Sequence, residues 1–409
     1  MHFDIETIRS HFPALERSNV LFDNAGGSAV LKHVADRISS YLLESSVQTG
    51  ATYKDSVIAQ DRVIQARKDI ATLINAPNDQ EVIMGGSTTL LLHLVCQSIA
   101  EHIQPGDEII VTSADHESNV GAWLSLEKKG AIVKFWEVNP QTYEFDLADL
   151  EALLTPKTKW VSMTHASNIL GSITPVAEVA DIVHNKGAKH CVDGVAYAPH
   201  RLVDVQATKA DMYVYSFYKT FGPHFAVLWC AMDTFAELES LNHYFIGKDV
   251  MPYKLQPGNV NYELSYGAVG IKDYLLSIAD NLGATGTPRE RMQAAFNAFD
   301  AHEQELSLSL LTYLKNRDDV EIIGATDLQD GRRLPTISFI VKDRQSQDVV
   351  EAIDTYGIGI RFGDFYAKRL ITQLNLVEKG GVIRVSMAHY NSHEEVNRLK
   401  QAFDEVLGN

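Results

Sequence analysis

Cysteine is scarce in this chain of 409 residues: three occur, at positions 96, 191 and 230. Their number is odd and no two of them have CxxC spacing, which excludes a disulfide framework and a cysteine-based zinc site. The histidines nearest to the second cysteine, His184 and His190, also match no standard ligand spacing. The sequence therefore predicts free thiols in a reducing compartment and no metal site.

Long apolar runs and an excess of positive charge are lacking as well. No apolar run reaches the length of a membrane span, and the first ten residues contain acidic side chains where a signal peptide would have an apolar core. The formal net charge of −17 argues against nucleic acid or an anionic membrane surface as the main partner. We expect a soluble, cytoplasmic protein with a small-molecule ligand.

The chain also lacks a GxGxxG dinucleotide fingerprint and a Walker motif, which disfavours a Rossmann-type oxidoreductase and a P-loop enzyme. Strand-like and helical patterns alternate instead. Strands are predicted at 108–113, 132–138 and 159–165, and helices at 119–129 and 175–186. This alternation predicts an α/β fold in which a mainly parallel sheet is covered by helices on both faces.

The pattern changes after about residue 285. A long helix is predicted at 289–316, strands at 335–341 and 381–387, and a terminal helix at 393–407. A chain of this length can form two domains. We therefore expect a large domain at 21–284, a smaller α+β domain at 285–409, and an N-terminal segment at 1–20 that packs with the small domain.

Lys219 is the residue that says most about function. It follows a strand-like run and precedes a Gly-Pro turn, and Asp193 lies 26 residues earlier at the end of another apolar run. A strand-end lysine and a strand-end aspartate suit the chemistry of pyridoxal 5'-phosphate (PLP). The amine would form a Schiff base with the cofactor, and the carboxylate would keep the pyridine nitrogen protonated.

Three other segments could contact such a cofactor. Gly85-Gly-Ser-Thr-Thr89 precedes a helical pattern, where backbone N–H groups and the hydroxyls of Thr88 and Thr89 could bind a phosphate; a plain helix cap is the alternative. His116 follows a strand and could stack on a flat ring, or it could be a surface histidine. Asn168 could donate a hydrogen bond to a phenolate oxygen of the cofactor, or it could belong to an ordinary turn.

Arg384 is a lone cation within a strand-like run and therefore needs a carboxylate partner. That partner can be a substrate or another residue of the protein, and the local sequence leaves both possibilities open. Arg361, in Gly359-Ile-Arg-Phe-Gly363, is a second candidate for binding a carboxylate.

Together these segments resemble the class V aminotransferases of PLP fold type I, in particular their cysteine desulfurase-like branch. The resemblance runs over nearly the whole chain and depends on the order and spacing of several motifs. They are Phe22-Asp-Asn-Ala-Gly26, Ser87-Thr-Thr89, Asp115-His-Glu-Ser-Asn119, His165-Ala-Ser-Asn168, Val192-Asp-Gly194, Ser216-Phe-Tyr-Lys219 and Arg384-Val-Ser386.

The resemblance implies a large domain built on a mainly parallel seven-stranded sheet and a smaller α+β C-terminal domain. It implies catalytic roles for Lys219, Asp193 and His116. The cofactor contacts that it implies come from Thr88, Thr89, His116, Asn168, Asp193, Ser216, Tyr218 and Lys219. The substrate contacts that it implies come from Arg384, Arg361, Asn24 and Ala25.

The resemblance further implies a homodimer with composite active sites. Asn259 and Tyr262, in the segment that begins at Gln256, would reach toward the phosphate of the partner subunit. Without the resemblance, this segment is a Pro-Gly turn.

Three positions depart from the family pattern. Tyr366 stands where the most similar bacterial desulfurases have a cysteine nucleophile, and sulfur transfer through a persulfide needs an accessible thiolate. Ala196 stands where relatives often have a glutamine or histidine that contacts the cofactor. Tyr218 stands where the residue before the lysine is commonly histidine. The cofactor is therefore shared with the desulfurases, but the reaction need not be.

We expect a PLP-dependent lyase or transferase that acts on a small amino acid, sulfur-containing or similar, by β-elimination with C–S cleavage or by amino transfer. No persulfide cysteine is expected to take part. The alternatives are a cysteine desulfurase proper, an amino-acid epimerase, and a PLP-binding protein without turnover.

Overall fold

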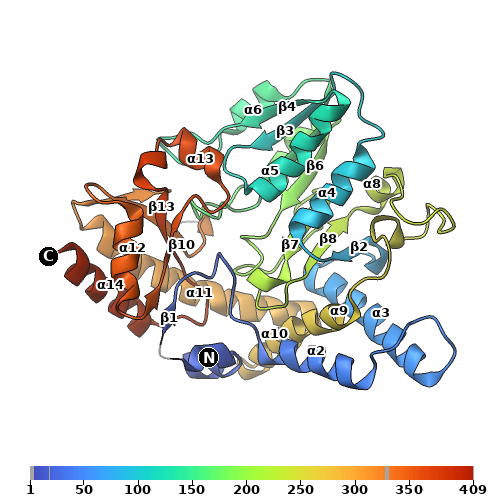
Figure 1. The fold of residues 1–409 in the computed structure, drawn as a ribbon, viewed down its shortest axis with the longest axis horizontal. Helices are drawn as coiled ribbons and strands as arrows, with labels where there is room; N and C mark the ends of the chain where they lie inside the picture. Colours follow the sequence, from blue (N-terminus) through green and yellow to red (C-terminus); the bar gives the residue numbers. More distant parts are fainter. Residues whose placement is uncertain (1–3, 18, 328–330, 409) are drawn as a thin grey trace.

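The computed structural model describes residues 4–17, 19–327 and 331–408, and its largest element is a seven-stranded sheet (Figure 1). The strand order is β2-β8-β7-β6-β5-β3-β4. The strands are β2 (Val82–Gly85), β3 (Glu108–Thr112), β4 (Ile132–Trp136), β5 (Thr158–Thr164), β6 (Lys189–Asp193), β7 (Met212–Ser216) and β8 (Ala226–Cys230). Only β8 runs antiparallel to its neighbours, which confirms the predicted mainly parallel sheet.

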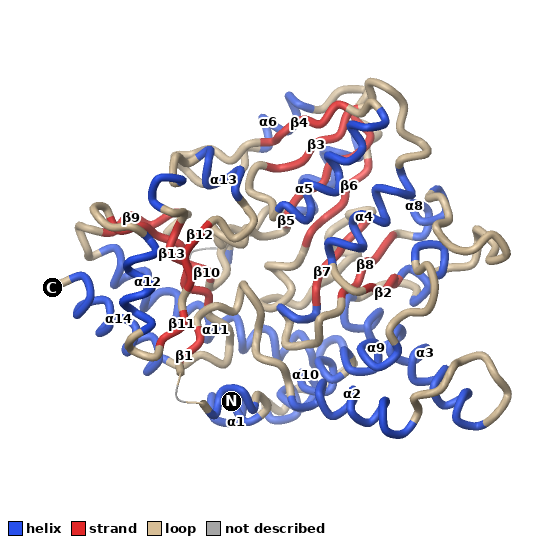
Figure 2. The backbone as a smooth tube through the Cα atoms, viewed as in Figure 1, coloured by secondary structure: helices blue, strands red, loops and turns tan. Residues whose placement is uncertain are grey.

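Helices cover both faces of this sheet, which explains why its strands are apolar on both sides. Successive residues of a strand point to opposite faces, so Cys191 packs in the core beneath α4 and α5 while Val192 packs in the core on the other side. Figure 2 shows the helices on either side of the strands. Those of this region are α2 (Lys32–Glu44), α3 (Lys54–Ile74), α4 (Thr88–Ile99), α5 (Glu117–Leu124), α6 (Leu147–Leu153), α7 (Val176–Asn185), α8 (Met232–Glu237), α9 (Tyr262–Ala268) and α10 (Gly270–Asn281).

A second, four-stranded sheet has the order β12-β13-β10-β9 and is antiparallel throughout. Its strands are β9 (Val320–Ile323), β10 (Thr336–Val341), β12 (Arg361–Gly363) and β13 (Val382–Ser386). The helices of this part are α11 (Pro288–Lys315), α12 (Ser346–Asp354), α13 (Lys368–Gln373) and α14 (His393–Leu407). The expected α+β character of the C-terminal part is therefore confirmed.

The N-terminal segment contacts the C-terminal part of the chain. Strand β1 (Val20–Leu21) pairs in parallel with β11 (Ile358–Gly359). In α1 (Ile5–Ser10), Arg9 forms an ion pair of 2.9 Å with Glu395 at the start of α14. That residues 1–20 pack with a small domain stays a prediction, which these contacts support.

Helix α11 joins the two halves of the molecule. Phe296 and Phe299, in its first half, pack in the core of the large sheet, whereas Leu306 and Leu310 pack in the core of the small sheet.

The expected domain limits 1–20, 21–284 and 285–409 remain a prediction, and residues 1–3, 18, 328–330 and 409 lie outside the described residues. None of the described helices is long and apolar enough to cross a membrane.

Candidate active site

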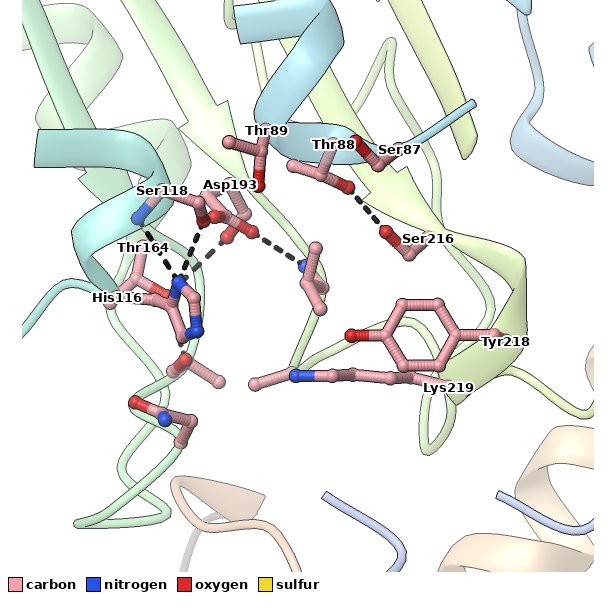
Figure 3. A pocket seen from close by; sticks show the side chains of 14 residues that line it. Ser87, Thr88, Thr89, His116, Ser118, Thr164, Asp193, Ser216, Tyr218 and Lys219 are labelled. Atoms are coloured by element: carbon pink, nitrogen blue, oxygen red, sulfur yellow. Dashed lines mark hydrogen bonds between the residues drawn. The ribbon is translucent and has the colours of Figure 1, made fainter. Parts of the chain in front are cut away.

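A cavity opens at the carboxyl ends of β5, β6 and β7 (Figure 3). Ligands of open α/β sheets bind at this edge, because parallel strands bring their last side chains and the following loops together there. All eight residues predicted to contact the cofactor line the cavity: Thr88, Thr89, His116, Asn168, Asp193, Ser216, Tyr218 and Lys219. Sequence reasoning did not single out Ser87, Ser118, Thr164, Ala166 or Val195, which also line it.

Lys219 ends a single 3-10 turn that follows β7, and this turn aims its side chain into the cavity (Figure 3). The residue is 8% exposed, and its Nζ lies 5.8 Å from the ring centroid of Tyr218. Burial lowers the pKa of the Lys219 amine to about 8, and the nearby positive charge of Arg384 acts in the same direction. About a tenth of this amine is therefore neutral, and nucleophilic, at pH 7, and about half of it at pH 8.

Asp193 is the last residue of β6 and is buried at the base of the cavity. Its Oδ1 accepts a hydrogen bond of 2.9 Å from the backbone N–H of Val195, which fixes the carboxylate. Burial raises the pKa of Asp193 to about 6, although the Val195 hydrogen bond and the charge of Lys219 favour the ionised form. A cationic ring nitrogen beside this carboxylate would stabilise its charged form further.

The N-terminus of α4 carries a cluster of hydroxyl groups. Thr88, in the first turn, lies with its Oγ1 2.6 Å from the Oγ of Ser216 at the end of β7. The capping role that sequence analysis left open for this segment belongs to Ser87, whose side chain accepts a hydrogen bond from the N–H of Leu90. The other hydroxyls and the free N–H groups of the first turn suit a phosphate group.

His116 caps α5, and its Nδ1 is held by the hydroxyl and the backbone N–H of Ser118 at 2.7 and 3.1 Å. Burial, and secondarily the charge of Lys219, lower the pKa of His116 to about 4, so the imidazole is neutral at physiological pH. A neutral ring can stack on a flat cation without charge repulsion. The ring of Tyr366 lies 5.2 Å from the imidazole of His116, centroid to centroid.

These groups fit PLP. A buried primary amine can bind its aldehyde, a buried carboxylate can face its ring nitrogen, and hydroxyls at a helix N-terminus can bind its phosphate. The carboxylate comes from β6, the amine from the 3-10 turn that follows β7, and the hydroxyls from α4 and the end of β7, and all of them converge on one cavity.

Comparison with known proteins identifies the family. Residues 20–254 and 281–399 match the family described as Aminotransferase class-V. The chain belongs to this family.

Its members that resemble the chain include aminotransferase-like protein FGM3 of Gibberella zeae, 39% identical with 99% of both chains covered. Cysteine desulfurase-like protein ustD of Aspergillus flavus is 32% identical, covering 99% of this chain and 91% of the relative. Among solved structures, the apo cysteine desulfurase of Thermococcus onnurineus has a TM-score of 0.86 at 25% identity, covering 100% of this chain and 99% of that one. The chain is thus a PLP-dependent enzyme of the class V aminotransferase family, related to the cysteine desulfurases.

The four residues predicted to contact substrate do not line the cavity of this class V enzyme. Arg384 and Arg361 are neighbours in register on β13 and β12 and both contact the carboxylate of Asp23. The side chain of Asn24 is buried and donates to the Ser386 carbonyl at 2.8 Å, and its own oxygen accepts from Tyr390. The N–H of Ala25 donates to Ser386 Oγ. Contact of these residues with substrate remains a prediction.

Sequence analysis did not identify two residues that contact Arg384, namely Asp23 and Phe365. Asp23 forms its ion pair, and the ring of Phe365 lies 3.7 Å from its guanidinium carbon. The backbone carbonyl of Phe365 also accepts a hydrogen bond of 3.0 Å from Asn168 Nδ2. Asp23 directly precedes Asn24 in the motif that carries the resemblance, so an acidic residue in this motif was the available signal.

The three departures from the family pattern all lie around the site. Tyr366 is 71% exposed and stands beside His116. Ala196 lines the cavity and offers no side-chain donor there. Tyr218 stacks on His224 with the ring centroids 4.9 Å apart and an angle of 4° between the planes. Two aromatic side chains, Tyr218 in the cavity and Tyr366 beside His116, therefore stand where the family resemblance leads us to expect a histidine and a cysteine.

The pKa of Lys219 predicts how cofactor uptake depends on pH. Only the neutral amine can attack an aldehyde, so with a pKa of about 8 the uptake rate of the apoprotein should rise about fivefold from pH 7 to 8. From pH 8 to 9 it should rise less than about twofold. Stopped-flow absorbance of the apoprotein mixed with PLP measures this rate. A rate that keeps rising about tenfold per unit up to pH 10 would show that the amine is not perturbed.

Proposed function

We propose that this enzyme removes a proton from Cα of a small amino acid, sulfur-containing or similar, and completes β-elimination or amino transfer without an enzyme persulfide. One observation carries the proposal: the cavity offers a buried amine beside a buried carboxylate, whereas all three cysteines of the chain are buried in its core. Lys219 supplies the amine and Asp193 the carboxylate.

When bound, PLP withdraws electrons from Cα of an attached amino acid and so makes its proton acidic. Asp193 would hold the ring nitrogen in its charged form, and Thr88 and Ser216 would hold the phosphate. His116 would stack on the ring and help to exclude water from it. Lys219 Nζ would accept the Cα proton; a pKa near 8 is well matched to a general base at physiological pH.

The same proton transfer can serve several outcomes. In β-elimination, the electron pair of the Cα–H bond becomes the second Cα–Cβ bond while the β-substituent leaves with the electron pair of its own bond. With cysteine as substrate, cysteine and water thereby give pyruvate, ammonia and sulfide. Return of the proton to the opposite face of Cα would instead give epimerisation, and amino transfer would need a 2-oxo acid as acceptor.

The burial of the thiols supports a route without persulfide. Cys96 lies in α4, Cys191 in β6 and Cys230 in β8, and burial raises the pKa of each thiol above its usual value. A persulfide-forming cysteine must be ionised and accessible, since the thiolate is the nucleophile. Tyr366, on the exposed loop beside His116, has a phenol instead of a thiol.

Alkylation tests this directly. Treatment of the native holoenzyme with N-ethylmaleimide is expected to attach no label and to leave turnover unchanged, because every thiol is buried. The Tyr366→Cys variant is the matched control and should take up one label, detected by mass spectrometry. Turnover by the wild-type enzyme that falls in step with labelling would contradict the proposal.

Product analysis separates the remaining functions. The holoenzyme is incubated with cysteine, cystine and alanine, and sulfide, pyruvate, alanine and the D-enantiomers are measured. Pyruvate with sulfide supports β-elimination, and formation of a D-amino acid supports the epimerase. Alanine with sulfide from cysteine would establish a desulfurase proper, and no turnover on any substrate would favour a PLP-binding protein.

We also propose a homodimer. Tyr244 and Phe245, in the loop between α8 and α9, are highly exposed, as apolar side chains covered by a partner often are in an isolated subunit. In the adjoining segment Asn259 is exposed, and the Tyr262 hydroxyl lies 3.1 Å from Thr49 of the same chain. The proposal includes a contact of Asn259 and Tyr262 with the phosphate bound by the partner subunit.

A further inference from the structure

Arg384 is sealed off from the cavity. Its side chain is 2% exposed, with Nη1 donating to the carbonyl of Asn168 at 3.2 Å and Nη2 donating to Asp23 Oδ1 at 3.0 Å. The ring of Phe365 covers one face of the guanidinium. Nε is buried and has no hydrogen-bond partner among the described residues. In this arrangement a substrate carboxylate has no access to the group expected to bind it.

Of the groups that enclose the Arg384 guanidinium, the side chain of Asp23 is the one that can move. Its side chain is 30% exposed, and its second oxygen lies 3.4 Å from Nη1 of Arg361, which is itself 55% exposed. The backbone of Asp23 is fixed by a bridge to Ser386, so a change of position needs only side-chain rotation. The carboxylate therefore has a second guanidinium within reach on the solvent side.

Gly26 leaves the room that this carboxylate needs. A Cβ added at Gly26 would lie 2.7 and 2.8 Å from the two carboxylate oxygens of Asp23, which is closer than non-bonded atoms approach. The backbone N–H of Gly26 donates to the Asp23 carbonyl, so the two residues form one tight turn. The position of the Asp23 carboxylate between the two arginines thus depends on a neighbouring residue without a side chain.

We propose that Asp23 is a built-in substitute for the substrate carboxylate: it occupies Arg384 in the resting enzyme and moves to Arg361 when substrate binds. The inference rests on the proposed role of Arg384 in binding the α-carboxylate. Before and after the exchange each carboxylate faces a guanidinium, so no buried charge is left without a partner. Asp23 thereby competes with every carboxylate that enters the site.

A binding experiment with a carboxylate that has no amine tests the exchange without turnover. The holoenzyme is titrated with propionate by calorimetry. Asp23→Asn is expected to lower the Kd by about threefold or more, because a neutral amide competes less well than a carboxylate for a guanidinium. Gly26→Ala, which displaces the Asp23 carboxylate sterically, should change the Kd in the same direction and serves as a second variant if Asp23→Asn does not fold.

Asp364→Asn is the matched control. It removes a negative charge near His116, and the amide oxygen can still accept the hydrogen bond that Asp364 Oδ1 receives from the N–H of Tyr366. Its Kd should stay within about twofold of wild type, since small changes in surface charge have small effects. Arg384→Lys, which keeps the charge but loses the guanidinium fork, should raise the Kd about tenfold.

The outcomes separate the proposed exchange at Asp23 from the proposed carboxylate-binding role of Arg384. If Arg384→Lys weakens propionate binding while Asp23→Asn weakens it too or leaves it unchanged, Asp23 only orients the arginine and the inference is overturned. If Asp364→Asn tightens binding as much as Asp23→Asn, the effect is general electrostatics and the inference is again overturned. If Arg384→Lys leaves the Kd unchanged, the carboxylate-binding role of Arg384 in the proposed function fails.

Discussion

Lys219→Ala is expected to lower kcat by at least about a thousandfold, because the variant would lose both the proposed nucleophile for the cofactor and the proposed base for the Cα proton. Lys219 is the residue whose amine projects into the cavity beside Asp193 (Figure 3). The absorption band of the lysine-bound cofactor should disappear in the same variant. Steady-state turnover of the best amino acid, together with an absorbance scan, measures both losses.

Lys219→Arg separates charge from chemistry. It keeps a cation near Asp193, so cofactor retention should suffer less, but the guanidinium cannot act as nucleophile or base and kcat should fall as far as in the alanine variant. Lys254 is another buried lysine, and its amine donates to the backbone carbonyls of Phe235 and Ala236 outside the cavity. Replacing Lys254 by alanine therefore measures the effect on kcat of losing a buried lysine that is not in the site. Retention of more than about a tenth of kcat by Lys219→Ala would remove the lysine from the mechanism.

Much of the fold could be predicted because local signals and tertiary packing agree. Helix α14 occupies the predicted range 393–407, since Ser392 and Glu395 form a capping box at its start. The helix predicted at 119–129 instead begins at Glu117, where His116 caps it, and ends at Leu124. The apolar pattern continues through a 3-10 turn to Lys129, and such a pattern does not distinguish the two helix types.

The cofactor pocket was predictable for a related reason. Asp193 and Ser216 end neighbouring parallel strands, and a sheet of known direction places such residues at one edge. The Asp23–Arg384 ion pair was not predictable, because the two residues lie 361 positions apart and meet only through the packing of the N-terminal segment against β13. Sequence analysis left a protein carboxylate and a substrate as equal partners for Arg384, and the structure shows the protein one.

The loop at Tyr366 shows a further limit of sequence reasoning. The family resemblance predicts a cysteine where this sequence has Tyr366, but it does not predict what the tyrosine does. In the structure Phe365 and Tyr366 both have positive φ angles of 50° and 60°, and this bend directs one ring over Arg384 and the other toward His116. Backbone conformations of this kind are rare for bulky side chains and cannot be inferred from composition.

Asp193→Asn is expected to lower kcat by about a thousandfold while the cofactor stays bound, because an amide cannot stabilise a positive ring nitrogen and Cα loses its electron withdrawal. The amide oxygen can still accept the Val195 hydrogen bond, so the geometry at the end of β6 should persist. Asp115→Asn is the matched control: Asp115 is also buried and does not line the cavity, its pKa is raised to about 7 mainly by burial, and its carboxylate accepts hydrogen bonds from the side chains of Thr112 and Asn119. The Asp115→Asn variant should lose less than about tenfold in kcat. Equal losses in the two variants would mean that Asp193 acts through packing, and a pH profile of kcat unchanged by Asp193→Asn would rule out its charge as the cause.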